Sequence, residues 1–190
     1  RRGHRIHHPI SIMINVLYLD DEAHNLTAFR AAFRRDFQVH VTTEPTDAVR
    51  ILREHPIEVI ISDQKMPKLS GVEFFELIAP DYPDPVRMLL TGHADIDAVI
   101  DAINKGQIYK YIAKPWNESE LRDLVTEASQ LYHDRQAIVL RGEDLQQRMS
   151  EAEQEAVKIQ SLTADKSALS AEETARVFEL ANAIQRLLQA

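Results

Sequence analysis

The order of apolar and polar positions along residues 13–132 predicts strands and helices in alternation. Short runs rich in β-branched and aliphatic residues, each bounded by turn-forming residues, predict strands. These runs are Asn15–Leu19, Phe37–Val41, Ile57–Ile61, Val86–Leu90 and Gln107–Ala113. Apolar residues recur at helical spacing in the segment after each run, which predicts a helix there. These helices are expected over Ala23–Arg35, Pro45–His55, Gly71–Ala79, Asp95–Lys105 and from Asn117 through Leu131.

Most of the predicted strands are apolar throughout, which indicates burial on both faces. In a chain that alternates strand and helix, such strands form a parallel sheet covered by helices. The predicted fold class is therefore α/β, a doubly wound five-stranded parallel sheet. Because ligands of such sheets bind beyond the carboxyl ends of the strands, the residues that follow each strand are the candidates for chemistry.

The last part of the chain favours long helices, since residues 116–190 contain no proline and one glycine, Gly142. Apolar residues recur there every seven positions, at Leu131, Ile138, Leu145, Ala152 and Ile159. One interpretation is a parallel coiled coil that continues the preceding helix and dimerises two copies. The other is an amphipathic helix that packs on its own domain or on a second helix.

A second tail helix is also expected. The segment Ser161–Ser170 is polar enough to break the first helix, and Ser170–Glu173 has the pattern of a capping box. The following residues place Val177, Leu180, Ala181, Ile184, Leu187 and Leu188 on one stripe, which must bury against something. A hairpin of the two tail helices would give a four-helix bundle on dimerisation.

Composition narrows the class of protein. Of 190 residues, 44% are hydrophobic, and the net charge is −8. The excess of basic residues that general binding to a nucleic-acid backbone requires is therefore absent. The chain has no cysteine, which excludes disulfides, thiolate metal sites and cysteine nucleophiles. No apolar run approaches the roughly 20 residues of a membrane span, so we expect a cytoplasmic protein without membrane contact. We interpret residues 1–12 as a disordered leader or tag remnant, with Met13 as the natural start.

Charged and hydroxyl side chains stand where the predicted strands end. Asp20 and Asp21 follow the first strand, Asp63 the third, Thr91 the fourth and Lys114 the fifth. A lone aspartate there is commonly a helix cap, but carboxylates that meet at about 4 Å repel by roughly 4 kcal/mol per pair at an effective dielectric constant near 20. Lys114 and a hard divalent cation, Mg²⁺ or Mn²⁺, would supply the counter-charge. Such a set is equipped for phosphoryl transfer onto an aspartate.

These residues, in this order, resemble the receiver domain of bacterial two-component response regulators over about residues 14–132. The motifs that carry the resemblance are Asp20–Asp21, Asp63 followed by Gln64–Pro67 and Gly71, Thr91, Tyr111 and Lys114–Pro115. The resemblance implies a flavodoxin-like fold and a Mg²⁺-dependent signalling phosphoprotein. We therefore divide the chain into a leader (1–12), a receiver domain (13–132) and a helical extension (133–190).

The resemblance also implies a role for each acidic residue. Asp63 would accept a phosphoryl group from a phosphohistidine of a sensor kinase or phosphotransfer protein. Asp21, Asp63 and the backbone carbonyl of Lys65 would ligate Mg²⁺, and Asp20 would act through water.

The remaining roles concern the phosphoryl group and the switch. Lys114 would pair with phosphoryl oxygens, Thr91 would move to hydrogen-bond them, and Tyr111 would rotate inward. That rotation would reshape the face made by the fourth helix, the fifth strand and the fifth helix, on which two copies can dimerise.

No catalytic output is expected in this chain. His133–Asp134 lacks the Gly-Tyr-Pro of a metal-dependent phosphodiesterase, and no cyclase signature or phosphate-binding loop is present. Two alternatives stay open: a receiver-plus-linker fragment of a larger cyclic-dinucleotide phosphodiesterase or other output enzyme, and a pseudo-receiver scaffold that never takes phosphate. A phosphatase with an aspartate nucleophile is disfavoured, because Asp20 and Asp21 are adjacent rather than spaced by one residue.

Overall fold

A computed structural model describes residues 13–92, 100, 107–164 and 170–189. The chain divides into two compact units, Arg1–Arg135 and Gln136–Ala190. The first contains the sheet with the helices around it, and the second contains helix alone within its described part. No helix among the described residues is both long and apolar enough to cross a membrane.

The first unit is built on a five-stranded parallel sheet with the strand order β2-β1-β3-β4-β5. The strands are β1 (Asn15–Leu19), β2 (Gln38–Thr42), β3 (Val59–Asp63), β4 (Val86–Thr91) and β5 (Lys110–Ala113). This is the flavodoxin-like order of a doubly wound sheet, so the predicted fold class is confirmed. The order reverses between β1 and β3, which makes their carboxyl ends the expected ligand crevice.

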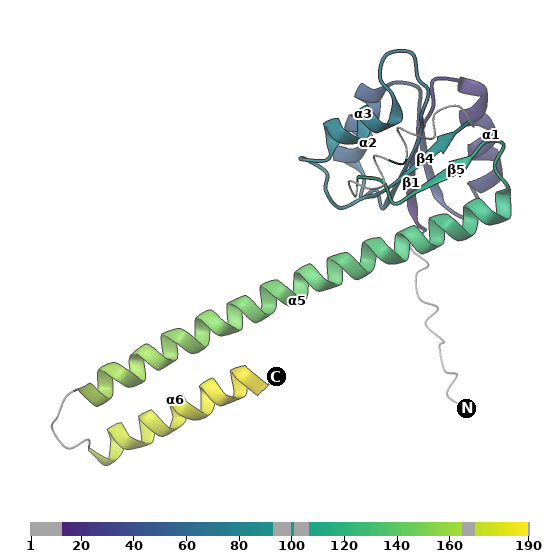
Figure 1. The fold of residues 1–190 in the computed structure, drawn as a ribbon. Helices are drawn as coiled ribbons and strands as arrows, with labels where there is room; N and C mark the ends of the chain where they lie inside the picture. The colour runs from purple at the N-terminus through teal and green to yellow at the C-terminus, as the bar shows by residue number, and fades with distance from the viewer. Residues whose placement is uncertain (1–12, 93–99, 101–106, 165–169, 190) are drawn as a thin grey trace, which may run out of the picture. The chain divides into compact units, whose positions relative to one another are not determined.

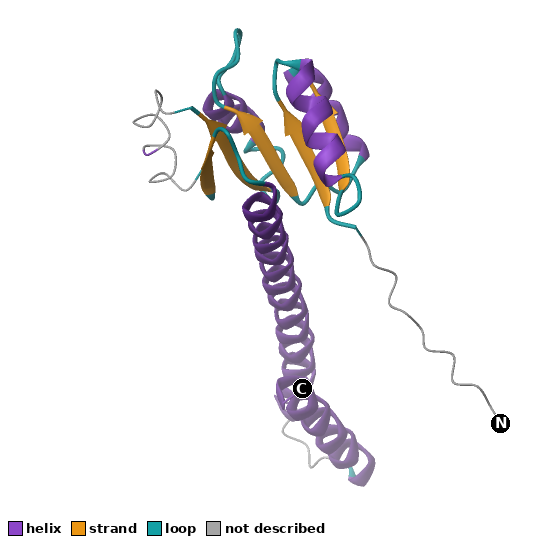
Figure 2. Cartoon of the chain, turned by 90° about the vertical axis from the view of Figure 1, so that its right-hand side faces the viewer, coloured by secondary structure: helices purple, strands orange, loops and turns teal. Residues whose placement is uncertain are grey.

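Helices cover both faces of the sheet (Figures 1 and 2). They are α1 (Ala23–Phe33), α2 (Pro45–Glu54), α3 (Gly71–Ile78) and the first turns of α5 (Glu118–Ala164). One core joins the sheet to α1 and α5 through Phe29, Phe33 and Val125, and the other joins it to α2 and α3 through Leu52 and Phe74. The helix predicted over Asp95–Lys105 lies outside the described residues, except for Ile100.

Local sequence explains where two of these helices begin. At α3, the Ser70 hydroxyl accepts from the Glu73 backbone N–H while the Glu73 carboxylate accepts from the Ser70 N–H, a full capping box. At α5, the Asn117 side chain accepts from the backbone N–H groups of Ser119 and Glu120, as its position before the helix predicts. The cap at Asn117 fixes α5 directly after Lys114–Pro115, whose peptide bond is cis.

The predicted bounds of β3 and β5 differ from the structure by two residues or more. The run from Ile57 predicts an earlier start for β3, but the Ile57 N–H bonds to the His55 carbonyl in a turn, and regular pairing begins at Val59. The run from Gln107 predicts a longer β5, whereas this strand begins at Lys110.

The unit Gln136–Ala190 contains the second part of α5 and α6 (Ala171–Gln189). The predicted break of the first tail helix within Ser161–Ser170 is confirmed, since α5 ends at Ala164 and α6 begins at Ala171. The first four residues of that segment, Ser161–Ala164, include no glycine or proline, and the helix continues through them. The predicted start of a new helix after Ser170 is confirmed.

Candidate functional site

The predicted site residues stand at the carboxyl edge of the sheet. Asp20 and Asp21 follow β1, Asp63 and Thr91 are the last residues of β3 and β4, and Lys114 follows β5. Because β1, β3, β4 and β5 are neighbours in the sheet, their ends present these residues along one edge. The structure brings the three aspartates and Lys114 together, whereas the Thr91 hydroxyl bonds to the Gly92 carbonyl and Tyr111 is partly exposed on β5.

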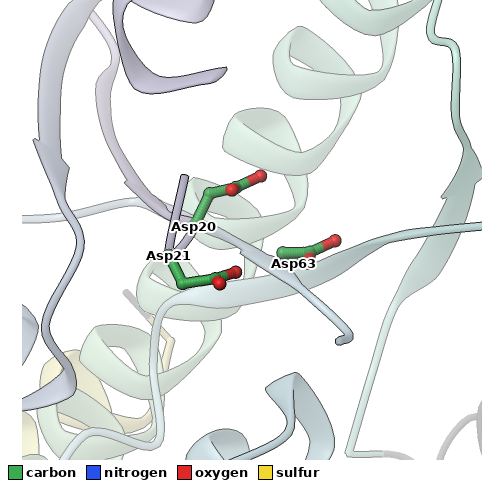
Figure 3. A group of neighbouring side chains, drawn as sticks. All are labelled: Asp20, Asp21 and Asp63. Carbon is green, nitrogen blue, oxygen red and sulfur yellow. The ribbon is translucent and has the colours of Figure 1, made fainter. Parts of the chain in front are cut away.

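The three carboxylates form one cluster. Asp20, Asp21 and Asp63 each offer a carboxylate oxygen, and these oxygens lie within 4.8 Å of one another. Figure 3 shows the three side chains next to each other, two from the turn after β1 and one from the end of β3. Asp20 and Asp63 are buried and Asp21 is exposed, so an ion can approach the cluster from the side on which Asp21 lies.

Lys114 supplies the counter-charge within the chain. Its Nζ lies 2.6 Å from Oδ1 of Asp63 and 3.1 Å from Oδ2 of Asp20. Burial lowers the pKa of Lys114, but the hydrogen bonds and charges of Asp63 and Asp20 outweigh burial and raise that pKa above its usual value. Lys114 therefore stays protonated and bridges two carboxylates that would otherwise repel each other.

Asp20 is held by several donors. Its Oδ1 accepts from the backbone N–H of Glu22 and from the Asn25 amide at 3.0 Å each, and its Oδ2 accepts from the Tyr18 hydroxyl, the Asn25 amide and Lys114. Burial raises the pKa of Asp20, but the bonds from Tyr18 and Asn25, with smaller contributions from Glu22 and Lys114, lower it below its usual value. Asp20 is therefore a fully ionised carboxylate with little freedom to rotate.

Asp63 has the opposite balance. Burial raises its pKa, and the charge of Asp20 adds to this effect. The hydrogen bond and charge of Lys114, with the backbone N–H of Lys65, oppose it without reversing it. A carboxylate whose ionised form is disfavoured by its surroundings gains from a cation placed beside it.

The loop after β3 is closed tightly around Asp63. The Gly71 N–H donates to the Gln64 carbonyl, and the Gln64 side-chain oxygen accepts from the Val72 N–H. A Cβ at Gly71 would lie 2.5 Å from the Asp63 carbonyl oxygen and 2.5 Å from Leu89 Cδ2. Only glycine leaves room for this approach, so the sequence spacing from Asp63 to Gly71 reflects packing against the site.

Thr91 and Tyr111 do not join the cluster. The Thr91 side chain is buried, and its hydroxyl donates to the Gly92 carbonyl at 2.9 Å. Tyr111 lies on β5 with 44% of its surface exposed. A Cβ at Gly92 would meet nothing within 4 Å, so the backbone after Thr91 has open space around it.

Two residues that contact Asp20, Tyr18 and Asn25, were not among the predicted site residues. Tyr18 precedes Asp20 by two positions on a strand, which places the two side chains on the same face, so alternation along β1 was an available signal. Asn25 lies in the first turn of α1, next to the acidic pair, and carried no signal apart from its polarity.

The donor set fits a hard divalent cation. Mg²⁺ and Mn²⁺ prefer carboxylate, carbonyl and water oxygens, and Mg²⁺ commonly binds through one or two carboxylates while keeping waters. Asp21 is exposed, and its carboxylate accepts no hydrogen bond from the described part of the chain. Asp20, in contrast, already accepts hydrogen bonds from four groups, which suits it to interact with an ion through water and not directly.

Comparison with known proteins identifies the family. The sequence pattern of the response regulator receiver domain matches residues 16–126. The chain belongs to this family, and its sheet and helices form a receiver domain. Receiver domains bind Mg²⁺ through an acidic pocket, and this chain has an acidic cluster, Asp20, Asp21 and Asp63, at the ends of β1 and β3.

Two curated relatives are transcriptional regulators. The chain is 39% identical over 123 residues to the hydrogenase transcriptional regulatory protein HoxA of Bradyrhizobium diazoefficiens, covering 65% of this chain and 25% of the relative. It is 36% identical over 113 residues to the protein of the same name from Cupriavidus necator, covering 60% of this chain and 23% of the relative. The chain thus spans about a quarter of the length of the relatives it matches.

A solved structure supports the same fold. The crystal structure of a response regulator receiver domain protein from Clostridium thermocellum aligns with 67% of this chain and 99% of its own. The two are 30% identical with a TM-score of 0.59.

Proposed function

We propose that this chain is the phospho-accepting part of a response regulator and that Asp63 is the acceptor. The observation that carries the proposal is the Asp63 carboxylate, buried beside two further carboxylates and 2.6 Å from Lys114 Nζ. A carboxylate oxygen of Asp63 would attack the phosphorus of a phosphohistidine. The O–P bond forms as the N–P bond breaks, and the leaving imidazole takes up a proton.

The surrounding residues would assist this transfer. Asp21, Asp63 and the Lys65 backbone carbonyl would hold Mg²⁺, and Asp20 would act on it through water. The ion would neutralise charge on the phosphoryl oxygens. Lys114, already protonated and partly exposed, would move from Asp63 to a phosphoryl oxygen as the carboxylate charge is consumed.

A cavity lies on the Lys114 side of the site, and neither Asp21 nor Asp63 lines it. It has a volume of about 620 Å³ and is lined by Tyr18, Asn25, Lys114 and Trp116 among others. We propose a sensor histidine kinase or a phosphotransfer protein as the partner.

Thr91 and Tyr111 would report the phosphorylated state. We propose that the Thr91 hydroxyl exchanges its bond with the Gly92 carbonyl for one with the phosphoryl group, and that Tyr111 then turns inward. Such an exchange shifts the population between two packings, driven by one new charged group.

We further propose that the receiver spans residues 13–132 and that 133–190 is a helical extension that dimerises. An output in gene regulation is supported by the relatives, which are named as transcriptional regulatory proteins. The extension would pass the state of the receiver to that output by protein contacts, without catalytic activity of its own.

The test is the intact mass after incubation with acetyl phosphate and Mg²⁺. The parent is expected to gain one phosphoryl group, Asp63→Asn none, and a control with an exposed aspartate changed, Asp47→Asn, one group as in the parent. A pseudo-receiver scaffold would gain no mass in any of the three, even with sampling fast enough to catch a short-lived acyl phosphate.

A further inference from the structure

The Asp20 carboxylate is oriented by a residue from inside the core. Tyr18 is 1% exposed, and its ring centroid lies 4.4 Å from that of Phe29, which in turn contacts Phe33 and Trp116. The ring is thus fixed by packing from α1 and from the segment after β5. Its hydroxyl donates to Oδ2 of Asp20, the oxygen that also accepts from Lys114.

Asn25 completes this arrangement from the other side. Its amide nitrogen lies 3.0 Å from Oδ1 and 3.1 Å from Oδ2 of Asp20, and 3.0 Å from a carboxylate oxygen of Glu22. Two side chains from different elements, β1 and α1, therefore fix the plane of one carboxylate. Asp21 in the same acidic pair has no comparable support.

We propose that Tyr18, with Asn25, is a positioning residue for divalent-cation binding. This inference rests on the proposed function of the acidic cluster and adds a residue to it. Tyr18 touches neither the ion nor the acceptor, and it acts through Asp20. Outer groups that orient the residues around a metal ion commonly change the affinity for the ion by 10–100-fold when they are removed.

A purely structural explanation makes a different prediction. A buried tyrosine hydroxyl usually needs a hydrogen-bond partner, and Asp20 could serve only as that partner. Loss of the hydroxyl would then lower the stability of the fold and leave the affinity for the ion unchanged.

Tyr18→Phe separates the two explanations, because it removes one oxygen and keeps the ring. The matched control is Tyr109→Phe, which removes a hydroxyl that donates to the carboxylate of Glu127 on α5, away from the cluster. Binding of Mn²⁺ without any phosphodonor is measured from the electron paramagnetic resonance signal of the free ion. We expect the Mn²⁺ dissociation constant to rise about tenfold in Tyr18→Phe, to rise also in Asn25→Ala, and to match the parent in Tyr109→Phe.

A second readout uses the reaction with acetyl phosphate. In Tyr18→Phe the Mg²⁺ concentration for half-maximal rate is expected to rise by the same factor, while the rate at saturating Mg²⁺ stays within about twofold of the parent. Equal Mn²⁺ affinity in the parent and Tyr18→Phe would overturn the inference and leave the proposed function intact. If the parent itself binds no Mn²⁺, both the inference and the proposed function fail.

Discussion

At the scale of single residues, Asp20 and Asp63 have opposite effects on the fold although both belong to the acidic cluster. The pKa of Asp20 is lowered, so its contribution to stability is present above the unfolded-state pKa and is lost as the pH falls through the folded-state pKa. The pKa of Asp63 is raised, so its contribution is present at low pH and is lost as the pH rises through the folded-state pKa. At neutral pH the ionised Asp63 therefore opposes folding.

Substitution by asparagine tests this difference. Asp63→Asn should raise the free energy of unfolding at pH 7, because it removes a charge that the fold disfavours. Asp20→Asn should lower the free energy of unfolding by roughly 1–3 kcal/mol, because buried donors from Tyr18, Asn25 and Lys114 lose an acceptor. Urea unfolding followed by fluorescence of Trp116, the one tryptophan of the chain, measures both. Destabilisation of equal size in the two variants would contradict the assignment.

Gly71 gives a second prediction at this scale. Gly71→Ala should lower the free energy of unfolding by about 1–3 kcal/mol, because the new Cβ overlaps the Asp63 carbonyl and Leu89. It should also slow phosphorylation by acetyl phosphate, since the backbone that carries Asp63 must shift.

Gly142→Ala is the matched control. Nothing lies within 4 Å of a Cβ at Gly142, a position inside α5, so alanine there should stabilise the helix by roughly 0.5–1 kcal/mol. Thermal unfolding of the two variants is expected to move in opposite directions. A neutral Gly71→Ala would show that the loop around Asp63 is looser than described.

The grouping of the residues that follow the strands could be predicted from the sequence, because a parallel sheet brings the carboxyl ends of its strands to one edge. This holds for any length or conformation of the loops. The partners of these residues were harder to predict, since Tyr18 carries the same pattern as any core aromatic apart from its place two residues before Asp20. The orientation of the Thr91 and Tyr111 side chains could not be predicted from the sequence either, because side-chain torsion angles leave no mark on the order of residues.

At the scale of elements, a buried carboxylate attaches α5 to the sheet. It lies at the amino end of β3, whereas Asp63 lies at the carboxyl end. Glu58, 5% exposed, directly precedes β3, and its carboxylate accepts from the Asn15 backbone N–H on β1 and from the Ser129 hydroxyl on α5. His133 lies 3.0 Å from the same carboxylate. The position of Glu58 inside the predicted run Ile57–Ile61 gave no sign of this role, because its burial depends on partners from two distant segments.

Ser129→Ala should lower the free energy of unfolding by about 1–3 kcal/mol, because the Glu58 carboxylate would lose a buried donor. Thr126→Ala is the control on the same helix, since the exposed Thr126 hydroxyl bonds only to the Arg122 carbonyl one turn earlier. Urea unfolding should leave this control within roughly 0.5 kcal/mol of the parent. If the two variants have the same free energy of unfolding, the bond from Ser129 to Glu58 contributes nothing to the attachment of α5.

At the scale of the whole molecule, the helical extension exposes part of the apolar stripe that recurs every seven residues from Leu131. Ile138 and Leu145 are 68% and 57% exposed, whereas Ala152, further along the same seven-residue series, is 8% exposed. Ala152 is therefore buried, whereas the earlier part of the stripe, at Ile138 and Leu145, is exposed. The seven-residue pattern alone could not decide between a coiled coil and a hairpin, since both bury the same positions.

The proposed dimer is tested on this stripe. Changing Ile138 and Leu145 together to glutamate should raise the dimer dissociation constant at least about a hundredfold, because burial of each side chain contributes roughly 1.5–3 kcal/mol. Leu140→Glu is the control, since Leu140 is equally exposed but points to the opposite face of the helix. Light scattering after size exclusion should give a monomer for the double variant and a dimer for the control. A monomeric parent would contradict the proposal.

The central claim is that Asp63 carries the phosphoryl group, and the most direct measurement identifies the modified side chain itself. The parent is phosphorylated with acetyl phosphate and Mg²⁺, and then treated with borohydride, which reduces an acyl phosphate to an alcohol as phosphate leaves. Fragmentation of the digested peptides should then place homoserine at position 63 and at no other aspartate. Homoserine at position 20 or 21, or phosphoryl transfer that leaves residue 63 unchanged, would contradict the account.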